Sequence, residues 1–155
     1  MNRQSLSGTG LCVCFQLRKT SRTITQLYDA ALQPAGLRST QFALLVAVAK
    51  KEPITISELG DLLVIDPTTL SRSLRKLQRM EHVELVSGAD RRERLVRLSS
   101  KGRRIVRKSL PHWAKVQEQV VSMLAQPGWR EIQKSLDGIR QVSQQVFEKN
   151  QADFR

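Results

Sequence analysis

The sequence predicts a mainly α-helical fold that carries one small β-hairpin, and three observations lead to this class. Apolar residues recur at helical spacing in six segments that cover most of the 155 residues. Two of these segments, residues 56–63 and 67–80, are short and are joined by a tight turn, which is the pattern of a helix-turn-helix. Two β-rich runs, residues 83–87 and 94–98, follow at once and flank a glycine and charged residues, as hairpin strands do. The combination predicts a winged helix-turn-helix, in which the hairpin is the wing.

Two helices are expected before this motif. The first runs from Leu11 to about Leu32, where Pro34 and a glycine interrupt the helical pattern. The second is expected to be capped by Ser39, has an apolar interior and stops before Pro53.

The helix-turn-helix itself has strong start signals. Thr55 and Glu58 have the spacing of a capping box, in which hydroxyl and carboxylate satisfy the free amides of the first turn. Asp66 is expected to cap the next helix, and Pro67 stands where its missing N–H has no consequence. That helix extends to about Met80.

Two helices are expected after the hairpin. Ser99 caps a long helix that continues through Leu124, and residues 126–128 interrupt the pattern. The last helix is amphipathic, and its apolar side consists of Ile132, Leu136, Ile139, Val142, Val146 and Phe147. Such an apolar stripe on so small a chain predicts an obligate-type helical dimer.

This order of elements predicts the domain organisation. Residues 1–10 are expected to be a flexible arm, and residues 37–99 the winged helix-turn-helix lobe. Residues 11–36 and 100–155 are expected to form a helical dimerisation region.

The charge points to a polyanionic partner. The formal net charge is +12 and the sequence pI is about 10.7. Residues 66–108 hold 13 Lys/Arg and 5 Asp/Glu, so a net +8 lies in this stretch. Nucleic acid and an acidic membrane surface are the two partners that such a balance favours. A membrane role is not expected, because the basic stretch is split between helix, hairpin and helix.

The remaining composition favours the cytoplasm. Two cysteines are too few for a disulfide scaffold, and the N-terminus lacks the pattern of a secretory signal. The histidines His82 and His112 lack the spacing of a metal site, so neither a metal nor another cofactor is expected.

The helix over residues 67–80 is the expected DNA-reading element. Leu70, Leu74 and Leu77 share one side of it. The opposite side carries hydrogen-bond donors that suit the major groove, namely Thr68, Arg72, Arg75, Lys76 and Arg79. The wing carries three arginines suited to the minor groove, namely Arg91, Arg92 and Arg94.

Three segments together resemble the MarR family: residues 66–72 (DPTTLSR), 90–92 (DRR) and 98–102 (LSSKG). The resemblance implies a homodimer that represses genes and releases double-stranded DNA when a ligand or an oxidant arrives. It also implies which residues contact DNA, namely Thr68, Thr69, Arg72 and Lys76 from the helix and Arg92 from the wing, which Asp90 braces.

The start of the first helix is similar to the organic-hydroperoxide-sensing branch of that family. Cys14-Phe15 and Tyr28 match the pattern of a sensing thiol that tyrosines hold, but Arg18 stands where a second tyrosine is typical. A nearby cation would lower the thiol pKa. Cys12 is two residues away, so on a helix the two thiols would point to nearly opposite sides. The alternative is a structural Cys14.

A small aromatic effector is the competing signal. Phe15, Phe42, His112 and Trp113 would line its pocket, as the resemblance implies. Arg18 or Arg22 would then pair with a carboxylate. The alternative is that these aromatic residues only pack in the core or in the dimer.

Two other functional classes are distinguishable on the sequence. An enzyme is not expected, because the sequence has no glycine-rich phosphate loop, nucleophile elbow or HExxH motif. A sequence-nonspecific, architectural DNA-binding protein would account for the charge, but not for the capped reading helix and the regular wing.

Overall fold

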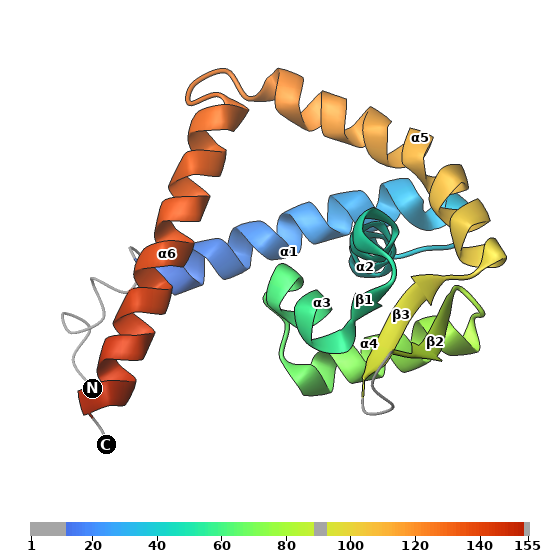
Figure 1. Ribbon diagram of the computed structural model, residues 1–155. Coiled ribbons are helices and arrows are strands. Elements are labelled where there is room, and N and C mark those ends of the chain that lie inside the picture. Colours follow the sequence, from blue (N-terminus) through green and yellow to red (C-terminus); the bar gives the residue numbers. More distant parts are fainter. Residues whose placement is uncertain (1–11, 89–92, 154–155) are drawn as a thin grey trace, which may run out of the picture. The chain divides into compact units, whose positions relative to one another are not determined.

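The computed structural model describes residues 12–88 and 93–153 (Figure 1). The chain divides into a first unit that ends at Val116 and a second that begins at Gln117. The predicted arm, residues 1–10, lies outside the described residues. The elements in chain order are α1 (Val13–Leu32), the 3-10 helix η3 (Gln33–Ala35), α2 (Ser39–Lys51), β1 (Ile54–Thr55), α3 (Ile56–Leu63), α4 (Pro67–Arg79), β2 (Val83–Ser87), β3 (Arg94–Leu98), α5 (Ser100–Met123) and α6 (Trp129–Asp153).

The two helices of the helix-turn-helix begin where the sequence predicts. The N–H of Glu58 donates to the Thr55 hydroxyl at 3.1 Å, and the Glu58 carboxylate accepts from the Thr55 N–H at 2.9 Å. The N–H of Thr69 donates to the Asp66 carboxylate at 2.9 Å, with Pro67 as the first residue of α4. Both predicted caps are confirmed.

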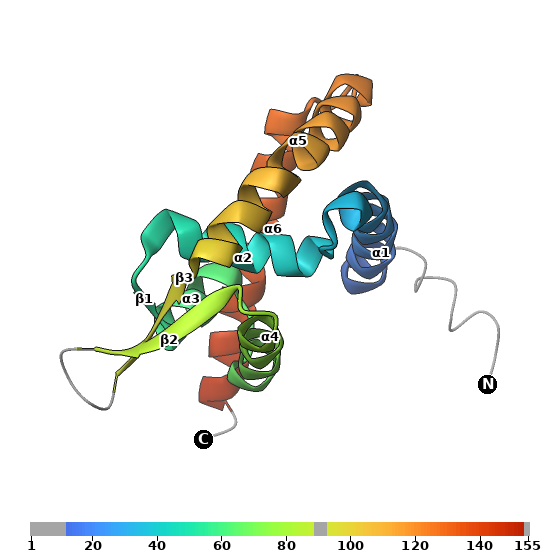
Figure 2. The same cartoon turned by 90° about the vertical axis from the view of Figure 1, so that its right-hand side faces the viewer.

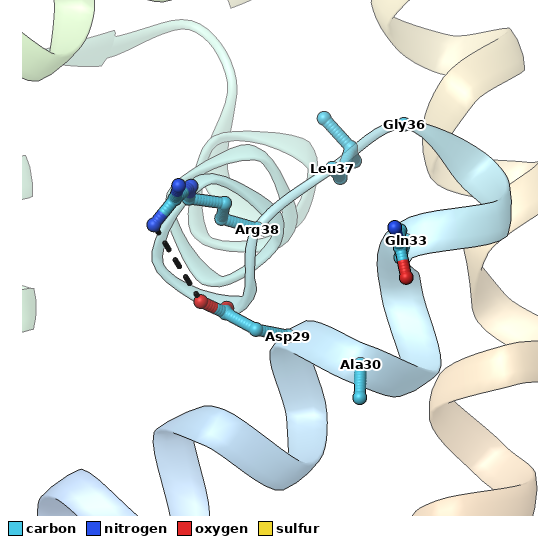
Figure 3. Close-up of a pocket in the computed structure, with 6 residues that line it drawn as sticks. All are labelled: Asp29, Ala30, Gln33, Gly36, Leu37 and Arg38. Atoms are coloured by element: carbon cyan, nitrogen blue, oxygen red, sulfur yellow. Dashed lines mark ion pairs between the residues drawn. The ribbon is translucent and has the colours of Figure 1, made fainter.

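The cap of α2 differs from the prediction. Ser39 is the first residue of the helix, and the preceding residue Arg38 is the cap. Instead of accepting, Ser39 donates twice to the Asp29 carboxylate of α1, from its N–H at 2.7 Å and its hydroxyl at 2.6 Å. Arg38 adds an ion pair to Asp29 at 3.9 Å, beside a pocket of about 400 Å³ (Figure 3). We call these contacts of Asp29 with Arg38 and Ser39 the α1–α2 joint. The expectation of a Ser39 cap was wrong because an acceptor from another helix satisfies these groups.

Asp29→Asn is expected to remove an acid-sensitive part of the stability. The hydrogen bond from the Ser39 hydroxyl, then that from its N–H and the Arg38 charge, hold the pKa of Asp29 below its ordinary 3.8. A carboxylate with a lowered pKa stabilises the fold above that ordinary value, and the contribution is lost as the pH falls through the folded pKa. Thermal unfolding at a series of pH values should show a smaller loss of stability below about pH 4 in the variant than in the wild type.

The matched control for that prediction is Asp61→Asn. Asp61 is an exposed carboxylate of α3, and its side chain makes no hydrogen bond or ion pair within residues 12–88 and 93–153. Its substitution should leave the pH dependence unchanged. If the wild type and Asp29→Asn lost the same stability in acid, the α1–α2 joint would not contribute to stability through the Asp29 charge.

The sheet has three antiparallel strands in the order β1-β3-β2. The predicted hairpin is confirmed, and its register pairs Val83 with Leu98 and Leu85 with Val96. The sequence did not predict β1, in which Ile54 pairs with Val96. Two residues are too few to show the alternation by which strands are recognised.

The core of the first unit lies between the helices and one face of this sheet. Leu32, Leu45 and Leu59 are fully buried in it, one from each of α1, α2 and α3. The predicted apolar side of α4 joins this core, since Leu70, Leu74 and Leu77 are at most 2% exposed. The buried stripe therefore fixes which side of α4 faces outward.

The wing joins α5 at a closely packed junction, which we call the wing–α5 junction and which consists of Glu81, His82, Ser99 and Gly102. Ser99 donates its N–H to the His82 carbonyl at 3.1 Å and accepts from the Gly102 N–H at 2.9 Å, so it caps α5 as predicted. Gly102 is buried against the backbone of His82. Glu81 has a φ of 59°, so the chain turns sharply between α4 and β2.

Two carboxylates attach this junction to its surroundings. Glu52, at the end of α2, accepts from the Leu98 N–H at 2.6 Å and pairs with Arg103 of α5. The side chain of Glu81 pairs with Lys101 at 2.7 Å. The start of α5 is thereby tied to both α2 and the end of α4.

The second unit consists of the end of α5, from Gln117 onward, and the whole of α6. Its side chains are at best half-buried over the residues described, and α6 exposes a set of large apolar residues, namely Leu136, Val142, Val146 and Phe147. In the first unit, α1 exposes Val13, Phe15, Ile24 and Leu27 in the same way. Within the described part of the chain, every helix is too short or too polar to cross a membrane.

Candidate nucleic-acid interface

The outward side of α4 is a polar and cationic surface. All six residues predicted to face DNA from this helix are exposed: Thr68, Thr69, Arg72, Arg75, Lys76 and Arg79. None of the four cations has an ion pair within the residues described. The charges therefore remain available to an anion from outside the chain.

Asp66 is an ionised cap at the start of this surface. Hydrogen bonds from Thr69, first from its side chain and then from its N–H, lower the pKa of Asp66 below 3.8. The carboxylate is therefore charged at neutral pH, where it suits the positive end of the helix dipole. Thr69 thus contributes to the start of α4 in addition to its predicted place facing DNA.

The two faces of the hairpin differ in charge. Arg94 lies opposite Ser87, on the same sheet face as Val96 and Leu98, whose side chains are buried. This face also packs against α4 through β2 (Figure 2). On the other face, Arg97 pairs with Glu84 at 2.8 Å, so its charge is partly neutralised. Arg94 is exposed and has no ion pair within the described part of the chain.

The remaining wing residues that the sequence singles out are not described. Asp90, Arg91 and Arg92 lie outside the described residues. The sequence did not single out the pairs of Glu84 with Arg97 or of Glu52 with Arg103. The hairpin register places Glu84 opposite Arg97, so pairing the strands would have revealed the first of these.

The structure separates the two parts of the predicted redox site. Cys12 and Cys14 are both exposed, at the start of α1. Tyr28 lies 14 residues further along the same continuous helix, which is about 21 Å at the rise of an α-helix. Cys14 and Tyr28 of one chain therefore do not meet. Burial raises the pKa of Tyr28.

The geometry assumed for the two cysteines also changes. The helix begins at Val13, and Cys12 is its cap, with extended backbone angles (φ −60°, ψ 118°). The expectation that the two thiols point to opposite sides assumed that both residues are helical. It therefore does not hold for this pair.

An apolar pocket of about 470 Å³ gathers part of the predicted effector site. Tyr28, Phe42 and Trp113 line it, and the rings of the last two are 6.1 Å apart between centroids. The rest of the lining is Leu32, Ser39, Ala43, Val46, Ala47, Lys50, Leu62 and Leu63.

Four residues predicted for this pocket are not among its lining residues: Phe15, Arg18, Arg22 and His112. The positive charge in the lining belongs to Lys50 instead. The aromatic residues could be found by their type. No sequence pattern pointed to Lys50, because it lies at the end of α2, whereas both cations predicted for the pocket lie in α1.

Known proteins share parts of this sequence. A family model described as the MarR family matches residues 35–93. YwoH of Bacillus subtilis, an uncharacterized HTH-type transcriptional regulator, is 30% identical over 84 residues, 54% of this chain and 61% of YwoH. SarZ of Staphylococcus haemolyticus, an HTH-type transcriptional regulator, is 32% identical over 72 residues, 46% of this chain and 49% of SarZ. The chain spans between 49% and 61% of the length of these two relatives.

Solved structures share the fold over a longer stretch. The transcriptional regulator MosR of M. tuberculosis, solved in complex with DNA, is 32% identical with a TM-score of 0.81, and the match covers 87% of this chain and 98% of MosR. A mutant MarR of E. coli, solved with operator DNA, is 20% identical with a TM-score of 0.78, over 86% of this chain and 97% of MarR. The latter likeness concerns the fold alone. These matches confirm the predicted winged helix-turn-helix.

Proposed function

Because the chain belongs to the MarR family of transcriptional regulators, we propose that it is a homodimeric repressor that binds a pseudo-palindromic operator in duplex DNA through α4 and the β2–β3 hairpin. Like its relatives, the chain is a transcriptional regulator and not an enzyme. In this proposal residues 37–99 are the DNA-binding lobe, and residues 11–36 and 100–155 hold the dimer.

The observation that carries the proposal is the two-sided nature of α4. Three buried leucines fix one side to the core, and the other side presents two threonines and four cations that have no ion pair in the described part of the chain. An α-helix fits the major groove, where arginine can donate two hydrogen bonds to guanine and threonine can contact a thymine methyl. Arg72 is proposed to contact a base, and Arg75, Lys76 and Arg79 complete the cationic surface.

The wing supplies the second contact. Arg94 lies on the hairpin face that packs against α4, so both elements can approach one side of a duplex. We assign the minor-groove contact to Arg91 and Arg92 as well, with Asp90 as the brace of the wing. Negative potential in a narrow minor groove attracts arginine.

The dimer has support from the exposed apolar residues of α1 and α6. Large apolar side chains in these helices remain in water in the isolated chain, for example Phe15 at 57% and Phe147 at 64% exposed. Burial of such side chains between two copies is favourable. A two-fold dimer presents two α4 helices to half-sites about one helical turn apart.

Two features can receive the signal that releases the operator. The pocket lined by Tyr28, Phe42 and Trp113 suits a small aromatic molecule, because its lining is mostly apolar with a few polar groups. Cys14 is exposed and can react with an organic hydroperoxide. Its thiolate attacks the peroxide bond, which gives a sulfenic acid and an alcohol, and a second thiol then displaces water to form a disulfide.

The test measures the affinity of the reduced protein for DNA from upstream of its own gene by fluorescence anisotropy, with scrambled DNA of the same length as the comparison. A regulator should prefer its operator by about 10³-fold or more. Equal affinity for both would favour the sequence-nonspecific, architectural alternative and overturn the proposal.

Oxidation by one equivalent of an organic hydroperoxide is the second step of this test. If Cys14 is the sensor, the wild type loses operator affinity and recovers it with added thiol, while Cys14→Ser keeps it. Cys12→Ser tests in parallel whether the neighbouring exposed thiol supplies the second sulfur of that disulfide. Loss of affinity in oxidised Cys14→Ser would exclude Cys14 as the sensor. Indifference of the wild type to the oxidant would leave the pocket as the signal site.

A further inference from the structure

Much of the positive charge of this chain is not used by the proposed DNA contacts. Residues 94–117 contain eight Lys/Arg and no Asp/Glu. Of these eight, Arg94 belongs to the wing surface, and Arg97 pairs with Glu84. The other six lie in α5, which is not part of the helix-turn-helix.

Three of these cations gather on one face of α5. Arg104, Arg107 and Lys108 are all exposed. Residues three and four apart are neighbours on a helix surface, so these three side chains lie within one turn of each other. The buried residues Val106 and Ser109 lie on the opposite side, toward the core. We call Arg104, Arg107 and Lys108 the α5 cluster.

The α5 cluster has no counterion within the residues that the structure describes, whereas its neighbours do. Lys101 pairs with Glu81 and Arg103 pairs with Glu52, both in the turn before the cluster. Like charges three and four residues apart lower the stability of a helix. An anion bound on this face would remove that repulsion, so the cluster favours a polyanion.

The α5 cluster lies close to the wing along the chain. Strand β3 leads directly into α5, which runs away from the hairpin (Figures 1 and 2). The strand spans about 13 Å from Arg94 to Leu98 at about 3.3 Å per residue. The cluster begins about 6 Å into the helix at 1.5 Å per residue. The cluster therefore begins within about 20 Å of Arg94, and a duplex that contacts the wing would have to bend toward α5 to reach this face.

We infer that Arg104, Arg107 and Lys108 form a second, sequence-independent DNA contact, which binds the duplex flanking the operator beyond the wing. The inference rests on the proposed function of α4 and the wing. Contacts of this kind go to phosphates and carry no sequence information.

The composition of this face favours DNA over an acidic protein. The centres of protein interfaces are apolar, and their hot spots combine aromatic residues with arginine, whereas lysine is depleted there. The side of α5 that carries the cluster continues with Pro111, which is uncharged, and then with Lys115 one turn later. Three cations that rise about 6 Å along the helix can each meet a separate phosphate, since each strand carries one phosphate per about 3.4 Å of duplex axis.

The test compares two duplexes, one trimmed to the operator footprint and one extended by about 15 base pairs on each side, which is about one and a half turns. The triple variant Arg104→Gln, Arg107→Gln and Lys108→Gln is expected to lose about 10-fold in affinity for the extended duplex and almost nothing for the trimmed one. The slope of log affinity against log salt on the extended duplex should fall by about 0.9 for each phosphate that the variant no longer neutralises.

Two controls accompany the triple variant. The double variant Arg104→Lys and Arg107→Lys keeps the charges and should bind both duplexes like the wild type, because a phosphate contact needs charge rather than the guanidinium shape. All three residues are exposed, and the triple variant removes their mutual repulsion, so its thermal stability should equal or slightly exceed that of the wild type.

The outcomes separate the inference from the proposed function. If the wild type prefers its operator to scrambled DNA but binds the trimmed and extended duplexes equally, the inference is wrong and the proposed function stands. The inference is also wrong if the triple variant loses regulation in cells with unchanged DNA affinity, which would indicate an acidic protein as the partner. If the wild type does not prefer the operator at all, both proposals fail.

Discussion

Gly102→Ala is expected to destabilise the protein by about 3 kcal/mol, at the upper end for an added methyl group in a packed site. A Cβ atom at position 102 would overlap the carbonyl oxygen of His82 and lie 2.9 Å from its carbonyl carbon. Both are backbone atoms, and that same oxygen accepts the N–H of Ser99. The chain can relieve the overlap only by moving the start of α5 away from the end of α4.

Urea denaturation at fixed protein concentration measures this effect, since the stability of a dimer depends on concentration. The midpoint should fall while the slope with denaturant stays the same. Gly138→Ala is the matched control, because a Cβ atom there meets no atom of the chain within 4 Å and alanine is the better helix former. Equal midpoints for Gly102→Ala and the wild type would show that the wing–α5 junction can accommodate the added methyl group without losing stability.

Arg72→Ala is expected to weaken operator binding by about 2 kcal/mol, which is about 30-fold, if Arg72 makes a bidentate contact with guanine. Binding to scrambled DNA should change much less, because there the residue acts only as one charge among several. Fluorescence anisotropy on both duplexes gives the ratio of the affinity for the operator to the affinity for scrambled DNA. We expect this ratio to fall in Arg72→Ala, rather than both affinities to fall by the same factor.

Two further variants define the nature of that contact. Arg72→Lys keeps the charge but cannot form the planar pair of hydrogen bonds, so it should lose nearly as much on the operator as Arg72→Ala. Arg97→Ala removes an exposed arginine that pairs with Glu84 and should change both duplexes little and equally. Wild-type binding by Arg72→Lys would reassign the residue to a phosphate.

The parts of the fold that the sequence predicted well depend on short-range interactions. The caps by Thr55, Glu58 and Asp66 join residues at most three positions apart, so they are visible in the sequence as patterns. The outward side of α4 follows from the helical period in the same way.

The parts that the sequence missed depend on residues far apart in the chain. The acceptor for the start of α2 is Asp29, ten positions before Ser39. Strand β1 exists because Ile54 pairs with Val96, and nothing within the two residues of β1 announces it. Such contacts are decided by the packing of the whole unit.

The pocket illustrates the same limit for the candidate site. Phe42 and Trp113 are large aromatic residues, so their type marks them as lining or core. Arg18 and Arg22 share α1 with Tyr28, but they lie ten and six positions before it, which places them about 80° and 120° around the helix from its side chain. Proximity in sequence therefore did not put them in the pocket.

The strand order β1-β3-β2 has a consequence for the growing chain on the ribosome. The central strand β3 is the last of the three to be synthesised, and its Val96 pairs with both Ile54 and Leu85. A chain halted after α4 thus has the helix that we propose to contact DNA, but not the complete sheet against which the helices of the first unit pack. Closing the span from residue 54 to residue 96 is a long-range step of the kind that slows folding. The first unit therefore completes its core only after β3 has been translated, so α4 can reach its final packing only once the hairpin has been made.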